Sequence, residues 1–475
     1  MRTMLRVAAI LVLAATTWIY AQVPTTPPAD ANLPAPGTRG NADNVQYLAT
    51  KSDPGGNPIR LAKATGHVSN YSEDKVPAYA LPDPLVMSSG EHVTSAEVWR
   101  TRRRPEILKL YETEIYGRVP DNAPRVAWEV TETDANARDG AAIMKRVVGR
   151  MGERPDRPRM NLTVYLPTKA SEPTPMLLSI TFGFPPGGRG GGAGDQGKKD
   201  GAGTAGQASS GTPQTKVLPK GRGPAFDALG ELLSRGWGYA TLGYTDIQPD
   251  RADQWTSGVV GLTLKEGESK PAPDQWGTIS AWSWGISRAI DYLETEKTIN
   301  PKQIAITGVS RLGKTVLWAS ARDERVAAVF SVVSGEMGAA LIRRDWGETL
   351  DDMAQNFSWQ FCGNLQKWVG RWNDLPVDQH MLIALSAPRP VYVNGGLTDQ
   401  WSDPKGEFLS MVAAGPVYRL LGQGDLGTSE LPPLDTPLTS GELAFHYHSG
   451  GHMAVPADWK LFLDFAERHF KGEAK

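Results

Sequence analysis

The 475-residue sequence contains a single cysteine, Cys362, and therefore cannot form a disulfide within the chain. Its stability must come from a hydrophobic core, for which 40% hydrophobic and 21% charged residues are ordinary values. Positive charge is not in excess, because 50 lysines and arginines stand against 52 aspartates and glutamates, giving a net charge of −2. This balance excludes a strongly basic nucleic-acid binder, and the hydrophobic content excludes a generally disordered protein.

Long hydrophobic runs are also missing. The run at residues 7–19 follows two arginines and is too short to span a bilayer comfortably. With Ala21 behind it, this pattern is typical of a secretory signal peptide over residues 1–21, with an uncleaved membrane anchor as the alternative. We therefore expect a secreted or periplasmic protein that has no membrane association after signal cleavage.

Two low-complexity segments interrupt the remaining chain. Residues 22–45 are rich in Pro, Ala, Thr and Asn, which predicts a flexible linker. Residues 185–224 consist mainly of Gly, Lys, Ser, Thr, Pro and Gln and have almost no apolar side chain. Such a segment cannot bury enough surface to offset its conformational entropy, so we predict a disordered insertion. Residues 46–475, apart from this insertion, are predicted to form one folded domain.

Hydrophobic periodicity predicts helices and strands that alternate through most of this domain. Helices are predicted at residues 99–116, 225–234, 278–296, 314–321 and 458–470. Strands are predicted at residues 125–132, 143–151, 161–167, 176–184, 237–242, 303–307, 326–333, 390–394 and 443–448. This order predicts an α/β fold with a mostly parallel sheet covered on both faces.

The segment that carries the clearest chemistry is Ile304–Lys314. A buried strand turns sharply through Gly-Val-Ser and enters a helix, which is the pattern of a nucleophile elbow with Ser310 at its tip. The helix N-terminus presents free N–H groups toward developing negative charge. The usual pattern is Gly-x-Ser-x-Gly, and here the second glycine, Gly313, comes one place late. The alternative is an ordinary strand–helix turn with serine as the N-cap.

A serine nucleophile requires a base and an acid that orients the base, and in this fold class the order is Ser, acid, His. The histidines after Ser310 are His380, His446, His448, His452 and His469. His452 follows a strand and a flexible Ser-Gly-Gly loop and precedes the last helix, so it is the candidate base, with a surface loop histidine as the alternative. Asp399, Glu336 and Asp403 each follow a predicted strand and remain competing candidates for the acid.

These residues resemble a known family. Residues 308–314 are similar to the Gly-Cys-Ser-Arg-x-Gly-Lys signature of the glucuronoyl esterases, carbohydrate esterase family 15. The similarity covers most of residues 95–470 and continues through residues 111–120, 343–348, 398–404 and 450–452. It implies an α/β-hydrolase catalytic domain, a three-layer sandwich with a mostly parallel central sheet. The implied substrate is glucuronoxylan or another lignin–carbohydrate ester, cleaved between glucuronic acid and a lignin alcohol.

The resemblance also implies roles for single residues. Ser310 matches the nucleophile, His452 matches the base, and Arg311 matches an arginine of the oxyanion hole. A guanidinium at that position carries a fixed positive charge, although a simple pairing of Arg311 with a nearby acid is the alternative. We expect no metal or organic cofactor, no nucleic-acid partner and a monomer.

Three further residues match positions that contact the sugar in the family. Lys314 and Glu348 match residues that hydrogen-bond the sugar hydroxyls, with a plain surface ion pair as the alternative. Lys314 lies four residues beyond Ser310, so both side chains project from the same face of the helix. Trp401 matches a tryptophan near the sugar, for which packing in the core is the alternative.

The chain departs from the family in two places. The cysteine before the nucleophile is replaced by Val309, which rules out the disulfide that this cysteine makes in fungal members. In many members the acid occupies the position of Val333, which cannot orient a histidine. Some bacterial members use an aspartate after the next strand instead, and this favours Asp399 over Glu336.

Two other functions remain open from the sequence. An acetyl-xylan or feruloyl-type esterase on the same fold would need neither Lys314 nor Glu348 to hold a glucuronoyl group. A non-catalytic carbohydrate-binding protein is compatible with the 15 tryptophans, which supply large stacking surfaces. A complete Ser-Asp-His set in the expected order argues against the binding protein.

Overall fold

The computed structural model describes residues 52–53, 55–62, 64–152, 158–169, 173–183 and 226–471. The predicted signal peptide, the predicted linker at 22–45 and the predicted insertion at 185–224 lie outside the described residues.

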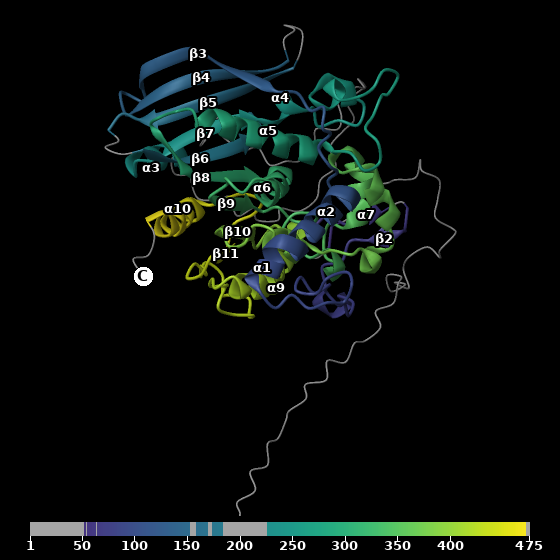
Figure 1. Ribbon diagram of the computed structural model, residues 1–475. Helices are drawn as coiled ribbons and strands as arrows, with labels where there is room; N and C mark the ends of the chain where they lie inside the picture. The colour runs from purple at the N-terminus through teal and green to yellow at the C-terminus, as the bar shows by residue number, and fades with distance from the viewer. Residues whose placement is uncertain are drawn as a thin grey trace, which may run out of the picture.

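The described chain is built around a nine-stranded sheet with the order β11-β10-β9-β8-β6-β7-β5-β4-β3 (Figure 1). Its strands are β3 (Val126–Ala137), β4 (Ala142–Met151), β5 (Arg159–Pro167), β6 (Thr174–Thr181), β7 (Gly238–Gly243), β8 (Ile299–Val309), β9 (Ala328–Val332), β10 (Val391–Gly396) and β11 (Leu443–His448). All neighbours among β6 to β11 pair in parallel, whereas β3, β4 and β5 join antiparallel at one edge. The sheet is therefore mostly parallel, as the alternation of strands and helices predicts.

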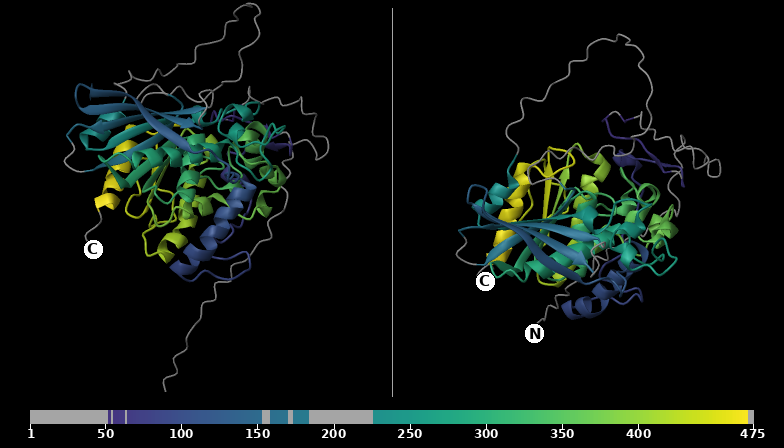
Figure 2. Two further views of the ribbon diagram at one scale, coloured as in Figure 1. Left: turned by 45° about the horizontal axis from the view of Figure 1, so that its top comes forward. Right: turned by 90° about the horizontal axis from the view of Figure 1, so that it is seen from above.

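Helices cover both faces of this sheet. They are α1 (Ala96–Val98), α2 (Arg104–Glu114), α3 (Ala228–Ser234), α4 (Tyr244–Ile247), α5 (Thr278–Leu293), α6 (Arg311–Arg322), α7 (Leu350–Asn356), α8 (Gln379–Ala384), α9 (Pro404–Leu420) and α10 (Pro456–Lys471). Helices α3 and α10 bury Leu232 and Phe462 against sheet residues such as Tyr239 and Phe330. Helices α2, α5, α6, α8 and α9 contribute to a larger apolar cluster that also contains sheet residues. Figure 2 shows the yellow α10 lying against the strands. The result is a three-layer α/β sandwich.

A small antiparallel pair, β1 (Leu61–Ala62) and β2 (His67–Val68), precedes the large sheet in the chain. It is fixed by a buried contact in which His67 Nε2 lies 2.6 Å from Asp345 Oδ1. Asn70 extends this attachment, because its side-chain amide donates to the Asp345 carbonyl and its own carbonyl accepts from the Gly347 N–H. The segment that contains Arg60 is thereby held against the loop that contains Glu348.

Among the residues that the structure describes, no helix is both long enough and apolar enough to cross a membrane.

Candidate active site

The turn between β8 and α6 places Ser310 in a strained conformation, with φ +59° and ψ −125°. The backbone passes so closely here that a Cβ on Gly308 would lie 2.4 Å from the Leu312 carbonyl oxygen. A Cβ on Gly313 would likewise lie 2.9 Å from the Cβ of Ser334, on the loop after β9. Both glycines are therefore required by close packing, the second of them one place later than in the usual pattern. The Ser310 side chain makes no capping hydrogen bond to α6, contrary to the N-cap alternative.

Asp399 and His452 are in direct contact at the carboxyl edge of the sheet. His452 Nδ1 lies 2.6 Å from Asp399 Oδ2, with the carboxylate side chain 8% exposed and the imidazole 30% exposed. Asp399 follows β10 and His452 follows β11, and these strands pair in parallel up to Gly396 and His448. The structure thus brings together an acid and a histidine from loops that leave adjacent strands at the same edge.

Ser310 leaves β8 at this same edge, separated from β10 by β9. Within the described residues no hydrogen bond joins Ser310 to His452. Ser402 Oγ, which lies 3.4 Å from His452 Nδ1, is a further hydroxyl near the imidazole. Ser310 and His452 thus follow parallel strands of one sheet at the same edge, which is the placement that a nucleophile and its base require in this fold.

The other two candidate acids have different surroundings. Glu336 is 3% exposed, and its Oε1 atom has no hydrogen-bond partner within the described structure. Burial raises the pKa of Glu336 well above its usual range, because a charged carboxylate is disfavoured in this apolar setting. Asp403 accepts from Arg344 Nε at 3.0 Å and caps α9 through the Gly406 N–H at 2.9 Å. Asp403 therefore has a structural explanation, and burial disfavours the charged form of Glu336 that would stabilise an imidazolium.

Arg311 directly follows Ser310 and forms an ion pair with Asp250. Its side chain is 25% exposed, and its guanidinium carbon lies 5.3 Å from the centre of the Phe357 ring. The pairing of Arg311 with an acid, which the sequence left as an alternative, is thus present. The ion pair with Asp250 uses only Nη1 of Arg311, so the guanidinium can contact a substrate while it stays paired.

Lys314 is buried, unlike the surface lysine that the alternative interpretation requires. Its Nζ donates to the Ser334 carbonyl oxygen at 2.8 Å. Burial lowers the pKa of Lys314, and the nearby Glu348 carboxylate partly opposes this shift. A lysine in this setting retains two N–H donors besides the one used by Ser334.

Trp401 and Glu348 lie together, joined by a residue that the sequence analysis missed. The Arg60 guanidinium carbon lies 4.0 Å from the centre of the Trp401 ring, and Arg60 Nη1 lies 3.9 Å from Glu348 Oε1. The backbone supports this grouping, because the Glu348 N–H donates to the Trp401 carbonyl at 3.0 Å. Trp401 is partly exposed rather than buried in the core.

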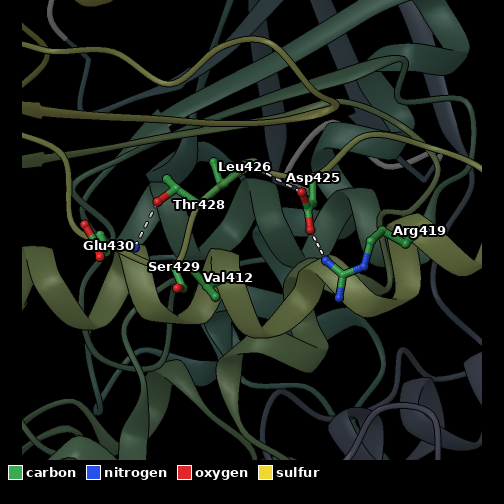
Figure 3. A pocket seen from close by; sticks show the side chains of 8 residues that line it. Val412, Arg419, Asp425, Leu426, Thr428, Ser429 and Glu430 are labelled. Atoms are coloured by element: carbon green, nitrogen blue, oxygen red, sulfur yellow. Dashed lines mark hydrogen bonds and ion pairs between the residues drawn. The ribbon is translucent and has the colours of Figure 1, made fainter.

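A groove of about 600 Å³ lies elsewhere, between α9 and the loop at residues 424–430 (Figure 3). Its walls include the ion pair between Arg419 and Asp425. None of the predicted site residues lines it. This groove is therefore separate from the candidate site, whose residues follow the ends of β8, β10 and β11.

Comparisons with known proteins agree with this geometry. The family described as "Glucuronyl esterase, fungi" matches residues 271–422, which contain the elbow and Asp399. A carbohydrate esterase from an unknown prokaryotic organism is 39% identical over 414 residues, which cover 86% of this chain and 93% of that protein. The solved glucuronoyl esterase from Solibacter usitatus is 39% identical with a TM-score of 0.73, covering 84% of this chain and 100% of the other. The chain belongs to the glucuronoyl esterases, carbohydrate esterase family 15.

Another solved relative extends the comparison. A promiscuous family 15 esterase from a marine bacterial metagenome is 37% identical with a TM-score of 0.70, covering 84% of this chain and 100% of its own. As a glucuronoyl esterase, the chain is a serine-type carboxylic ester hydrolase with an α/β-hydrolase fold. The fold class, the family and the enzyme class predicted from the sequence are confirmed.

Proposed function

We propose that this glucuronoyl esterase cleaves esters between (4-O-methyl-)glucuronic acid of xylan and lignin alcohols, with Ser310, His452 and Asp399 as its catalytic triad. The observation that carries the proposal is the 2.6 Å contact between Asp399 and His452, at the sheet edge where the Ser310 elbow also ends. Curated relatives named 4-O-methyl-glucuronoyl methylesterases support the glucuronoyl group as the acid portion of the substrate.

In this mechanism Ser310 Oγ attacks the ester carbonyl while His452 takes its proton. Asp399 holds the imidazole in the tautomer with hydrogen on Nδ1 and stabilises the imidazolium that forms. The alcohol leaves with the proton from His452, and water then attacks the acyl-enzyme with His452 again as base. The products are the free uronic acid and the alcohol, so atoms and protons balance without any other reactant.

Arg311 is proposed to stabilise the tetrahedral oxyanion together with a backbone N–H at the start of α6. One preorganised donor of this kind is worth about 3–4 kcal/mol in the transition state. The position of Arg311 immediately after the nucleophile supports the role, as does its attachment to Asp250 through one nitrogen alone.

The sugar is proposed to bind between Lys314, Glu348 and Trp401. Lys314 lies one helical turn beyond Ser310, and Glu348 lies beside Trp401, to whose carbonyl its N–H donates at 3.0 Å. The Glu348 carboxylate also opposes the lowering of the Lys314 pKa by burial, which supports this grouping. An ammonium donor and a carboxylate acceptor can hydrogen-bond neighbouring hydroxyls of one sugar, while the partly exposed Trp401 offers a ring face to a sugar or lignin ring.

We further propose that the protein acts as a monomer outside the cytoplasm, in the periplasm or the medium. The signal-like residues 1–21 support export. A polymeric substrate also favours this location, because xylan–lignin esters do not enter cells.

The test compares benzyl glucuronate with an acetylated xyloside, using wild type and Ser310→Ala. We expect the wild type to prefer the glucuronate ester by at least about 100-fold in kcat/KM, and Ser310→Ala to lose at least about 1,000-fold in kcat. Ser429→Ala, in the groove of Figure 3, is the control and should retain wild-type activity. Preference for the acetate would instead support the acetyl esterase, and full activity in Ser310→Ala would refute the serine mechanism.

A further inference from the structure

Asp250 is a buried carboxylate in the loop after α4, and the sequence analysis assigned it no role. Its side chain is 7% exposed and forms the ion pair with Arg311 Nη1. Its other oxygen, Oδ1, accepts from Trp359 Nε1 at 2.7 Å and from Gln360 Nε2 at 2.9 Å. Both oxygens are therefore occupied by donors from two other parts of the chain, which fixes the orientation of the carboxylate.

The loop that carries Asp250 is itself rigidly attached. Gln248, which is fully buried, donates through Nε2 to the Gln254 carbonyl at 2.9 Å and accepts the Val260 N–H at 3.1 Å. Trp282 of α5 donates through Nε1 to the Gln248 carbonyl at 2.8 Å. The loop that carries Asp250 is thus held by contacts with the core that do not involve Arg311.

A long arginine side chain gains most as an oxyanion donor when its position is fixed before the reaction begins. Among the described residues, Asp250 is the only ion-pair partner of Arg311, and it engages Nη1 alone. The other guanidinium nitrogens stay available for a second acceptor. Opposing this benefit, the negative charge of Asp250 weakens the field of Arg311 at the oxyanion.

We propose that Asp250 is a positioning residue that holds Arg311 toward the oxyanion of the tetrahedral intermediate. The inference rests on the oxyanion role proposed above for Arg311. We expect placement to outweigh the opposing charge, because Asp250 is paired with the guanidinium whereas Arg311 directly follows the nucleophile. Since the effect is confined to the transition state, loss of Asp250 lowers kcat and leaves KM nearly unchanged.

The experiment is a double-mutant cycle with Asp250→Asn and Arg311→Gln, measured on benzyl glucuronate with kcat and KM separated. We expect Asp250→Asn alone to lower kcat by about 10- to 100-fold with KM within about 3-fold. In the Arg311→Gln background the same change should lower kcat by less than about 2-fold, because the residue through which Asp250 acts is gone. Asp250→Glu should recover part of the lost kcat.

The matched control is Asp253→Asn, three residues along the same loop. Asp253 is exposed and pairs with the exposed Arg251, so its removal should leave kcat within about 2-fold of wild type. If Asp250→Asn does not fold, Trp359→Phe is the alternative variant, because it removes one hydrogen-bond donor to the Asp250 carboxylate. That variant should lower kcat by about 3-fold, and the loss should vanish in the Arg311→Gln background.

The outcomes separate this inference from the proposed function. An unchanged or increased kcat in Asp250→Asn, with a large loss in Arg311→Gln, would overturn the positioning role alone. A loss that persists in full in the Arg311→Gln background would also overturn it, since Asp250 would then act independently of Arg311. If Arg311→Gln by itself leaves kcat unchanged, the proposed role of Arg311 fails, and this inference fails with it.

Discussion

Thr398 donates its backbone N–H to the Gly450 carbonyl oxygen at 3.1 Å, and its hydroxyl reaches the same oxygen at 3.2 Å. This contact joins the loop that contains Asp399 to the loop that contains His452. The approach is close, since a Cβ on Gly396 would lie 2.4 Å from the Gly451 carbonyl oxygen. The acid–base contact is therefore held by backbone hydrogen bonds as well as by the two side chains.

The first prediction concerns the acid. Asp399→Asn should lower kcat for benzyl glucuronate by about 1,000- to 10,000-fold, because an amide does not hold the imidazole in the required tautomer. Glu336→Gln should stay within about 3-fold of wild type, because burial disfavours the charged form of this carboxyl that would hold an imidazolium. Steady-state kinetics at pH 7 decides between Asp399 and Glu336 as the acid. A large loss in Glu336→Gln with a small loss in Asp399→Asn would assign the acid to Glu336.

The second prediction concerns stability and pH. The folded-state pKa of Glu336 is raised by burial above the ordinary value of 4.5. As pH rises, the unfolded chain therefore loses the Glu336 proton before the folded protein does. The contribution of Glu336 to stability is fully present below pH 4.5 and is lost as pH rises toward the folded-state pKa. Glu336→Gln removes this titration, so its Tm should rise relative to wild type as pH increases from 4.5 to 8.

Thermal unfolding at several pH values measures this difference. Glu266→Gln is the control, because Glu266 is exposed, and its Tm should follow that of wild type at every pH. If the Tm difference between Glu336→Gln and wild type stays constant or decreases as pH rises, Glu336 is ionised in the folded protein.

Much of the central architecture follows from local sequence pattern. The predicted strand at 443–448 matches β11, and the predicted helix at 278–296 matches α5 except at its last turn. The elbow could be predicted because its whole geometry is encoded within residues 304–314. Each of these segments is defined by its own periodicity or turn residues, independently of distant contacts.

Helix α9 was not predicted, although it has 17 residues. Pro404, Gly406, Gly415 and Pro416 interrupt its pattern, and such residues normally indicate a loop. In the structure Pro404 occupies the first turn, where its missing N–H costs little, and Asp403 caps the helix. Tertiary packing against β10 and β11 therefore outweighs the weak local signal.

The candidate site was predicted only where its residues lie within a motif. The choice among Asp399, Glu336 and Asp403 depends on how three loops fold back over one sheet edge, which spacing does not encode. Asp250 and Arg60 carry no local signal in the sequence. Asp250 contacts Arg311, which lies 61 positions later, and Arg60 contacts Glu348, which lies more than 280 positions later. The roles proposed for them rest on contacts that only the folded structure reveals.

The third prediction concerns a buried carboxylate behind the His452 loop. Asp458, near the start of α10, is fully buried and lies 2.7 Å from His446 Nδ1. It also accepts from Tyr392 at 3.1 Å, from Asn394 at 2.8 Å and from the Val455 N–H at 2.8 Å. Asp458→Ala should reduce the free energy of unfolding by about 3–5 kcal/mol, because it leaves these buried donors without an acceptor.

Denaturant unfolding measures this loss. Asp464→Ala, on the exposed side of the same helix, is the control and should change the free energy of unfolding by less than about 1 kcal/mol, since Asp464 pairs with Arg235 near the surface. Equal effects of the two variants would show that the Asp458 network contributes no more than a surface ion pair.

The last prediction concerns Arg60, whose guanidinium lies over Trp401 and near Glu348. If the sugar binds beside these residues, Arg60→Ala should raise KM for benzyl glucuronate by about 3- to 10-fold, because it removes a cation–π contact worth about 0.5–2 kcal/mol that orients the ring. The kcat should stay within about 2-fold, since Arg60 contacts Trp401 and Glu348 and not Ser310. Arg371→Ala is the control, because Arg371 stands over Trp368 at 5.9 Å on an exposed surface. A lower KM in Arg60→Ala would mean instead that the guanidinium competes with the substrate for the tryptophan face.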